Sequence, residues 1–299
     1  MSGLTIIKPL AITPAMLTST DVPEADYAAY AGGTTYAADV RVIDSHLIYQ
    51  SLQASNTGHT PATSPTWWVQ VSATNRYKLF DLVNSSQTAQ STSMTYTVRP
   101  GVVVNSIAAV NMQSVYSIRV RMTSDAYGLV YDQTISRSRL PSDASWWAWF
   151  FGARTAALTT YTLDLPSFVD AAITVDFTGL SDMAVGNLIF GTVSTWGLAM
   201  STAVSLGIRD YSKKETNEWG DIVLTQRAFA KKAQFPLVLA ASDVDALFNH
   251  LATLRATPCV WIGSSDFTST VVYGFYQDFE IIISYPLVAD CNLTLEGLA

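Results

Sequence analysis

Residues 67–81, WWVQVSATNRYKLFD, join two parts of the chain that differ in size and composition. The two tryptophans at the start of this stretch end a compact segment rich in aromatic residues. Asn75 to Asp81 begin a longer segment made of short apolar runs. No run of Gly, Ser or Pro of the kind that forms a flexible linker lies between the two. We therefore expect two β units that are joined directly.

The 299 residues are enough for two or three domains. In the first 25 residues, short apolar runs are interrupted by Pro9, Pro14 and Pro23, so this segment either adds an edge strand to a neighbouring chain or packs on its own domain. We divide the chain into an N-terminal arm (1–25), a small β module (26–72), a β-sandwich (73–200) and a C-terminal α+β domain (201–299).

The composition excludes several classes of function. Apolar residues make up 49% of the chain, which is enough for a sizeable core, and the net charge of −7 without a cluster of Lys and Arg argues against nucleic-acid binding. Cys259 and Cys291 lie in apolar runs, which predicts buried thiols. His46, His59 and His250 are scattered, so we expect no metal and no cofactor.

Neither a membrane span nor a catalytic centre is predicted. No apolar run reaches transmembrane length, and the N-terminal residues lack the pattern of a signal peptide. There is no Gly-x-Ser-x-Gly elbow and no glycine loop that could cradle a phosphate. Aspartates at 164, 170, 176 and 182 are interpreted as turn residues, with a carboxylate pair for glycoside hydrolysis as the alternative. We expect no enzymatic activity.

The small module contains a predicted hairpin. Residues 36–43 are typical of a strand, and 46–52 are typical of its partner across Asp44 and Ser45. A unit of this size without disulfides has a marginal core, so large aromatic residues must supply it.

This module resembles the small chitin-binding modules of bacterial chitinases, carbohydrate-binding families 5 and 12. The resemblance is carried by YAADVRV (36–42), LIYQS (47–51), NTGHTP (56–61) and Trp67. It implies a sugar site of solvent-facing aromatic rings, for which Tyr36, Tyr49, Trp67 and Trp68 are the candidates. The chain departs from the family at 52–55, LQAS, where exposed aromatics are usual. Because some candidates must build the core, a purely structural module is the alternative.

Residues 73–200 predict a β-sandwich, because short strands alternate with Gly and Pro turns. The expected strands are 93–98, 102–110, 116–122, 128–132, 172–177 and 183–191. The block resembles galactose-binding-like jelly rolls, although Leu82 stands where those domains often have a glycine after Phe-Asp. Its aromatic run is our candidate protein interface, with packing in the core or between domains, or a sugar platform, as alternatives. The run contains Trp146, Trp147, Trp149, Phe150 and Phe151.

The C-terminal part predicts one helix on a sheet. Ser242 is expected to cap the helix with Asp245 as its capping-box partner. Val244, Leu247, Leu251 and Leu254 fall on one helical face.

The C-terminal part, with the whole layout, resembles a family of tailed-bacteriophage virion proteins. The resemblance is carried by DYSKKE (210–215), TQRA (225–228), LRATP (254–258), WIG (261–263), YGFYQDF (273–279) and CNLTLEGL (291–298). It implies a structural protein of the virion tail, made in the host cytoplasm. Such a tail tip or collar adaptor would form a homo-oligomeric ring and dock other tail proteins or fibres. A module that binds glycans on the host surface is the alternative.

Overall fold

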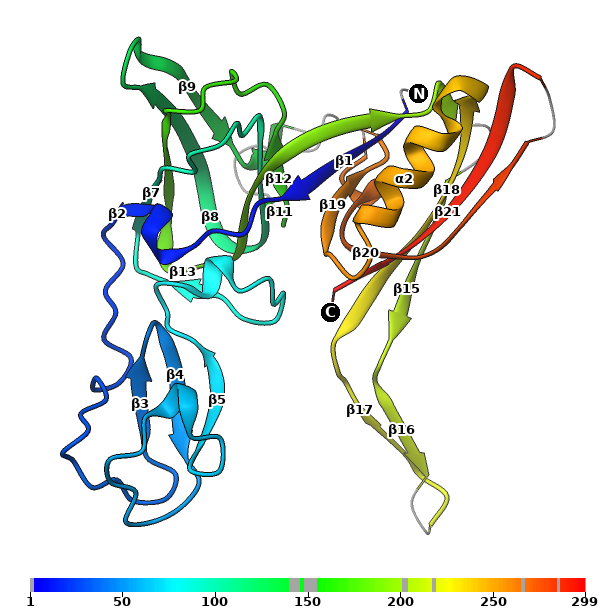
Figure 1. Cartoon of the computed structure of the whole chain (residues 1–299). Coiled ribbons are helices and arrows are strands. Elements are labelled where there is room, and N and C mark those ends of the chain that lie inside the picture. Colours follow the sequence, from blue (N-terminus) through cyan, green and yellow to red (C-terminus); the bar gives the residue numbers. More distant parts are fainter. Residues whose placement is uncertain are drawn as a thin grey trace.

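The structure is a computed structural model that describes residues 3–139, 146–147, 155–156, 158–200, 204–216, 219–264, 267–283 and 286–298. These residues form large antiparallel sheets and one α-helix that lies on a sheet, which confirms the predicted mainly β fold class. Figure 1 shows a small module in blue, a first β body in green, and a second body in yellow to red that carries the helix.

The first body is a sheet in the order β2-β7-β13-β8-β9, with β6 and β12 at its margins. Its strands are β2 (Leu17–Thr20), β6 (Thr88–Ala89), β7 (Ser93–Val98), β8 (Ser106–Ser124), β9 (Gly128–Ser136), β12 (Thr160–Thr162) and β13 (Ala172–Trp196). Met94, Val120 and Phe177 face a core that Leu79 and Leu165 close from outside the sheet. Alternating apolar positions therefore build one sandwich-like core, as the sequence predicts.

Two pairs of expected strands are in fact two long strands. Residues 106–110 of the first expected strand and 116–122 of the second belong to β8, which runs through Asn111 (φ 53°) and Ser114 (φ 52°) without ending. The register of β8 against β13 shifts at Gly179, so the irregularity is a bulge and not a turn. A Cβ on Gly179 would lie 2.2 Å from the Ser114 carbonyl oxygen, so the strands approach this closely only with glycine.

The strand β13 belongs to both bodies. Its first part, 172–178, lies between β7 and β8. Its last part, 191–196, pairs with β1 (Leu4–Pro9) of the second body. One hydrogen-bonded sheet therefore continues across the boundary that the sequence places after residue 200.

The second body continues the sheet in the order β13-β1-β19-β20-β21-β18, with β14 and β15 both on β18. Its further strands are β14 (Ala199–Met200), β15 (Ser205–Asp210), β18 (Phe229–Ala240), β19 (Cys259–Ile262), β20 (Val271–Ile282) and β21 (Val288–Gly297). Leu4, Ile6 and Ile7 of β1 are buried between β13 and β19. The N-terminal segment thus packs within its own chain, which is the second of the two alternatives above.

Helix α2 (Val244–Thr253) packs on this sheet through the face that its sequence predicts. Leu247, Leu251 and Leu254 are buried in one cluster with Phe235 and Trp261. The predicted capping box is wrong. A 3-10 turn, Ala241–Asp243, precedes the helix, so its N-cap is Asp243, and no side chain bonds the first helical N–H groups. The Ser242 hydroxyl donates to the Asp243 carboxylate instead, at 3.0 Å.

The small module is the sheet β3-β4-β5 (Arg41–Asp44, Leu47–Ser51 and Trp68–Ala73). The expected hairpin is present, although its first strand begins only at Arg41. Ser45 (φ 51°) and His46 (φ 68°) form its two-residue turn, and two positive φ angles match a turn whose twist suits the strands. The four remaining short strands form two further pairs, β10 (Ser138–Arg139) with β11 (Thr155–Ala156) and β16 (Lys213–Thr216) with β17 (Ile222–Thr225).

Both cysteines are buried free thiols, as predicted. Burial raises the pKa of the Cys259 thiol to about 12 and that of Cys291 to about 11. We expect neither thiol to react with a disulfide reagent at pH 8 until the protein is unfolded, when both react. The unfolded chain loses these protons at lower pH than the folded chain, so the free energy of unfolding should fall as pH rises above the ordinary thiol pKa. Rapid labelling of one thiol in the folded protein would contradict this.

Candidate functional site

The aromatic candidates of the small module lie mainly in its core. Tyr36, Tyr49 and Trp68 are buried together with Val42. The ring centroids of Tyr36 and Trp68 are 5.3 Å apart at 71°, an edge-to-face contact, and the Trp68 Nε1–H donates to the His59 carbonyl at 2.8 Å. Three of the four predicted sugar-binding residues therefore supply the core that this small unit needs.

Trp67 is the candidate that keeps a partly exposed ring. It stacks on His59, with ring centroids 4.0 Å apart and an interplanar angle of 11°. His59 comes from the loop 56–61 that carried the resemblance to chitin-binding modules. No sequence pattern predicts a contact between these two residues, because only the folded loop brings them together. A sugar platform on this module would consist of Trp67 and His59.

A cluster of polar side chains around Arg41 forms a second surface of the module, and this surface was not predicted from the sequence. On β3, the Arg41 guanidinium lies over the Tyr27 ring at 5.9 Å and donates to the Tyr27 hydroxyl at 3.2 Å. The Arg41 Nε–H donates to Gln50 Oε1 at 3.1 Å, and the Gln50 amide donates to Asp39 at 2.8 Å. Arg41 and Gln50 are directly opposed on neighbouring strands, and this register is the signal that could have found the pair.

Residues 74–77 attach the module to the first body through Glu24. The Thr74 hydroxyl donates to the Glu24 carboxylate at 2.7 Å, and His46 and Arg76 lie 3.0 Å and 3.5 Å from it. Burial, followed by the charge of Glu24, raises the pKa of Tyr77, whose ring lies against His46. The module is therefore fixed by charge-assisted contacts as well as by the direct connection that the sequence predicts.

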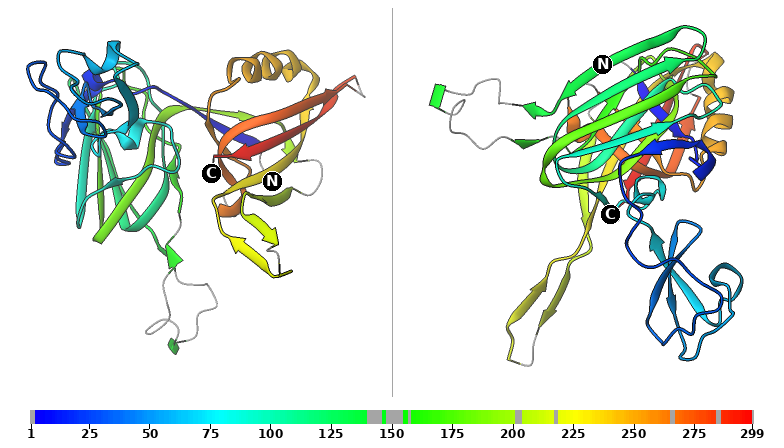
Figure 2. Two further views of the ribbon diagram at one scale, coloured as in Figure 1. Left: turned by 90° about the horizontal axis from the view of Figure 1, so that it is seen from below. Right: turned by 90° about the vertical axis from the view of Figure 1, so that its left-hand side faces the viewer.

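The predicted aromatic interface lies only partly within the described residues. The Trp146 and Trp147 side chains are exposed. Trp149, Phe150 and Phe151 lie outside the described residues. In the sequence the run lies between β10 and β11, and these two paired strands stand at the margin of the first body (Figure 2).

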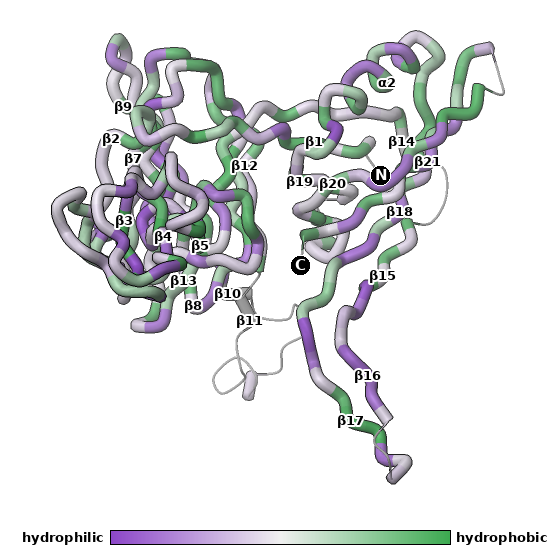
Figure 3. Tube along the Cα trace, turned by 60° about the horizontal axis from the view of Figure 1, so that its bottom comes forward, coloured by the Kyte–Doolittle hydropathy of each residue, from purple (hydrophilic) through white to green (hydrophobic). Residues whose placement is uncertain are grey.

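A longer projection leaves the second body. We call residues 205–216 and 219–229 the projecting hairpin. Its base is β15, which pairs with β18 in the sheet, and its outer strands β16 and β17 extend away from the sheet on the side opposite to α2 (Figures 1 and 2). Ile208, Ile222 and Leu224 are 68%, 70% and 66% exposed. Figure 3 shows the hydrophobic residues of β17 well away from any other sheet.

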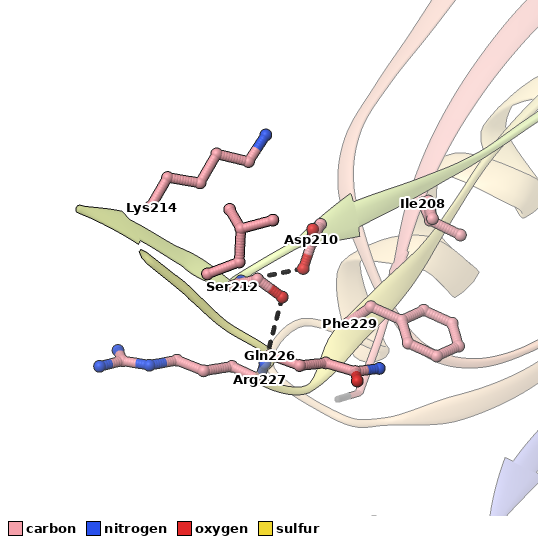
Figure 4. A pocket seen from close by; sticks show the side chains of 8 residues that line it. Ile208, Asp210, Ser212, Lys214, Gln226, Arg227 and Phe229 are labelled. Carbon is pink, nitrogen blue, oxygen red and sulfur yellow. Dashed lines mark hydrogen bonds between the residues drawn. The ribbon is translucent and has the colours of Figure 1, made fainter. Parts of the chain in front are cut away.

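The projecting hairpin bends where its two ladders meet. The pairing of β15 with β18 ends at Asp210 and Phe229, and the pairing of β16 with β17 starts at Lys213 and Thr225. At the bend, the Ser212 N–H donates to the Asp210 carboxylate and the Arg227 N–H donates to the Ser212 hydroxyl, at 2.9 and 3.1 Å (Figure 4). A cavity of about 500 Å³ opens beside these residues.

Glu296 anchors the base of the projecting hairpin. This nearly buried carboxylate on β21 accepts from Arg209 at 3.1 Å and from the Tyr211 hydroxyl at 2.7 Å, and it also accepts from the amide of Gln277. Its hydrogen bond with Tyr211 is the main reason why the pKa of that phenol is raised. The base is thus held by a polar cluster.

Replacing Glu296 with glutamine should loosen the base of the hairpin. The change keeps the shape but removes the charge that strengthens its hydrogen bonds, a loss of about 1–3 kcal/mol. We expect amide hydrogen exchange in residues 205–211 to accelerate by about tenfold or more. The control is Lys213→Ala, which breaks the surface ion pair with Glu215 and should change little. Equal exchange in Glu296→Gln and the unmodified protein would contradict the anchoring role.

Comparisons of the chain with protein-family models, with curated proteins and with solved structures gave no match. The family relationships inferred from the sequence therefore stay predictions. In the described part of the chain, no three or more His, Cys, Asp or Glu residues are placed to hold a metal ion. No helix among these residues is both long and apolar enough to span a bilayer.

Proposed function

We propose that this chain is a structural protein of a bacteriophage virion, a tail tip or collar adaptor that assembles with copies of itself and with other tail proteins or fibres. The observation that carries the proposal is the projecting hairpin. A two-stranded ribbon is marginally stable in water, and this one exposes Ile208, Ile222 and Leu224 instead of burying them. Exposed apolar side chains gathered on one projection are typical of a protein–protein interface.

The sheet that continues through both bodies supports the same proposal. The projecting hairpin and the small module both extend from one hydrogen-bonded framework. A framework of this kind holds several contact surfaces at fixed angles, which an adaptor between other proteins requires. The location in the virion tail is proposed from the sequence resemblance to tail proteins.

Two measurements test the proposal. Light scattering coupled to size-exclusion chromatography should give a mass that is a multiple of the 32.5 kDa chain. Antibodies against the purified chain, applied to particles made from the genome that encodes it, should label the tail in electron micrographs. A monomer at every concentration would contradict self-assembly, and labelling confined to the head would contradict the tail location.

We propose glycan binding by the small module as a second candidate function. The observation that favours it is the stacked pair of Trp67 and His59, which offers a partly exposed aromatic face beside a polar loop. Aromatic faces of this kind stack on sugar rings.

Trp67→Ala should weaken the binding of chitin oligosaccharides about tenfold, because one stacking contact contributes about 1 kcal/mol or slightly more. Isothermal titration of the two proteins measures the change. Tyr127→Ala, which removes an exposed aromatic ring from the first body, is the matched control and should bind normally. If the unmodified protein gives no binding heat, or if Trp67→Ala binds equally well, glycan binding at this pair is excluded.

A further inference from the structure

The second body has an apolar groove at the end opposite to the projecting hairpin. The groove has a volume of about 410 Å³ and lies between α2 and the end of β20. Phe279 contacts Phe248 in it, with ring centroids 5.7 Å apart and an interplanar angle of 66°. Phe248 is 54% exposed, and Ile283 at the end of the groove is 69% exposed. Large apolar side chains are therefore left in water here as they are on the hairpin.

Acidic side chains border the groove, and two cations lie near Leu224 on the projecting hairpin, which also carries Asp210, Glu215 and Asp221. Asp245 and Glu280 line the groove, and in the described part of the chain neither takes part in an ion pair. The projecting hairpin carries the exposed cations Lys214 and Arg227 (Figure 4), and Lys214 is directly opposed to Leu224 on the neighbouring strand. Complementary charge around apolar contacts favours one orientation of docking over others.

The two surfaces cannot meet within one copy, because the hairpin and α2 point to opposite ends of the second body (Figures 1 and 2). We propose that the projecting hairpin of one copy docks in the α2 groove of a second copy, in a head-to-tail contact. This inference rests on the proposed self-assembly and names the surfaces that perform it. A head-to-tail contact uses two different surfaces, so it leads to a ring if the rotation closes and to a filament if it does not.

The test uses two variants of the full chain. Leu224→Asp places a like charge opposite the acidic groove, and Ile283→Asp places a charge in the apolar part of the groove. Each should raise the dissociation constant of self-assembly at least about tenfold. Leu129→Asp and Leu287→Asp are the controls, because both leucines are exposed outside the two surfaces and both variants should assemble normally.

Mixing the two variants is the decisive measurement. The Leu224→Asp copy keeps an intact groove and the Ile283→Asp copy keeps an intact hairpin, so an equal mixture should form a one-to-one heterodimer that grows no further. Native mass spectrometry with one copy mass-tagged measures this. If both variants assemble like the unmodified protein, the inference is wrong and the copies assemble through other surfaces. If the mixture stays monomeric, the inference is wrong because the intact hairpin does not dock in the intact groove. An unmodified protein that never assembles overturns the inference and the proposed function together.

Discussion

Trp68→Ala is expected to unfold residues 26–72 while the two larger bodies stay folded. Trp68 is 2% exposed and contacts both Tyr30 and Tyr36, so its removal takes away the largest side chain of the module's core. Truncating a buried tryptophan costs about 3–5 kcal/mol, and a unit this small has little more than that to lose. The measurement is limited proteolysis, with new cuts expected only within the module.

Trp67→Ala is the matched control for this experiment. Its ring is partly exposed, stacks on His59 and packs against the edge of the buried cluster without being buried itself. It should leave the module resistant to protease. Equal sensitivity of the two variants would mean that the burial of Trp68 is not what holds the module together, and loss of all folded structure would mean that the module does not unfold by itself.

The second large effect is expected from Ile6→Asp. Ile6 is fully buried on β1, which pairs with β13 on one side and β19 on the other. An unpaired carboxylate in that core must be desolvated or take up a proton, at a cost of several kcal/mol on top of the lost apolar burial. We expect the midpoint of urea unfolding to fall sharply, or the protein to fail to fold.

Thr5→Asp is the control for this experiment. It tests whether a charge is harmful anywhere on β1 or only on the face that carries Ile6. Thr5 is the next residue along the strand, its side chain points to the opposite face, and its hydroxyl bonds Thr195 at an exposed site. Its substitution should shift stability by about 1 kcal/mol or less. If Ile6→Asp is equally mild, β1 leaves the sheet easily, and the segment behaves as an exchangeable arm.

Local patterns predicted the elements whose residues alternate between buried and exposed. The strand 93–98 is present with the same limits, and Leu247, Leu251 and Leu254 form the buried face of α2. The start of α2 was predicted wrongly because the N-cap depends on the turn that precedes the helix. A serine at position 242 is compatible both with an N-cap and with a 3-10 turn. The continuity of β8 and β13 was missed because a bulge and a turn use similar residues.

The interaction surfaces were less accessible from the sequence. Ile222, Val223 and Leu224 form a continuous apolar run, which is typical of a buried strand. In the structure all three are exposed, and only the position of the hairpin outside the sheet reveals this. The sequence also could not distinguish buried from exposed residues among the aromatic candidates of the small module. Tyr49, Trp67 and Trp68 have similar sequence contexts, and only the fold decides which of them the core takes.

The strand shared by the two bodies has a mechanical consequence. A pull on the projecting hairpin passes through β18 and its neighbours in the sheet to β1, and from β1 to the last residues of β13. The force then reaches the first body along the axis of β13. There the hydrogen bonds of β13 to β7 and to β8 are loaded at the same time and resist sliding of the strand. A flexible linker at the same place would let the bodies swing before any load was transmitted. We therefore expect the two bodies to keep the angle between them when the protein is under tension.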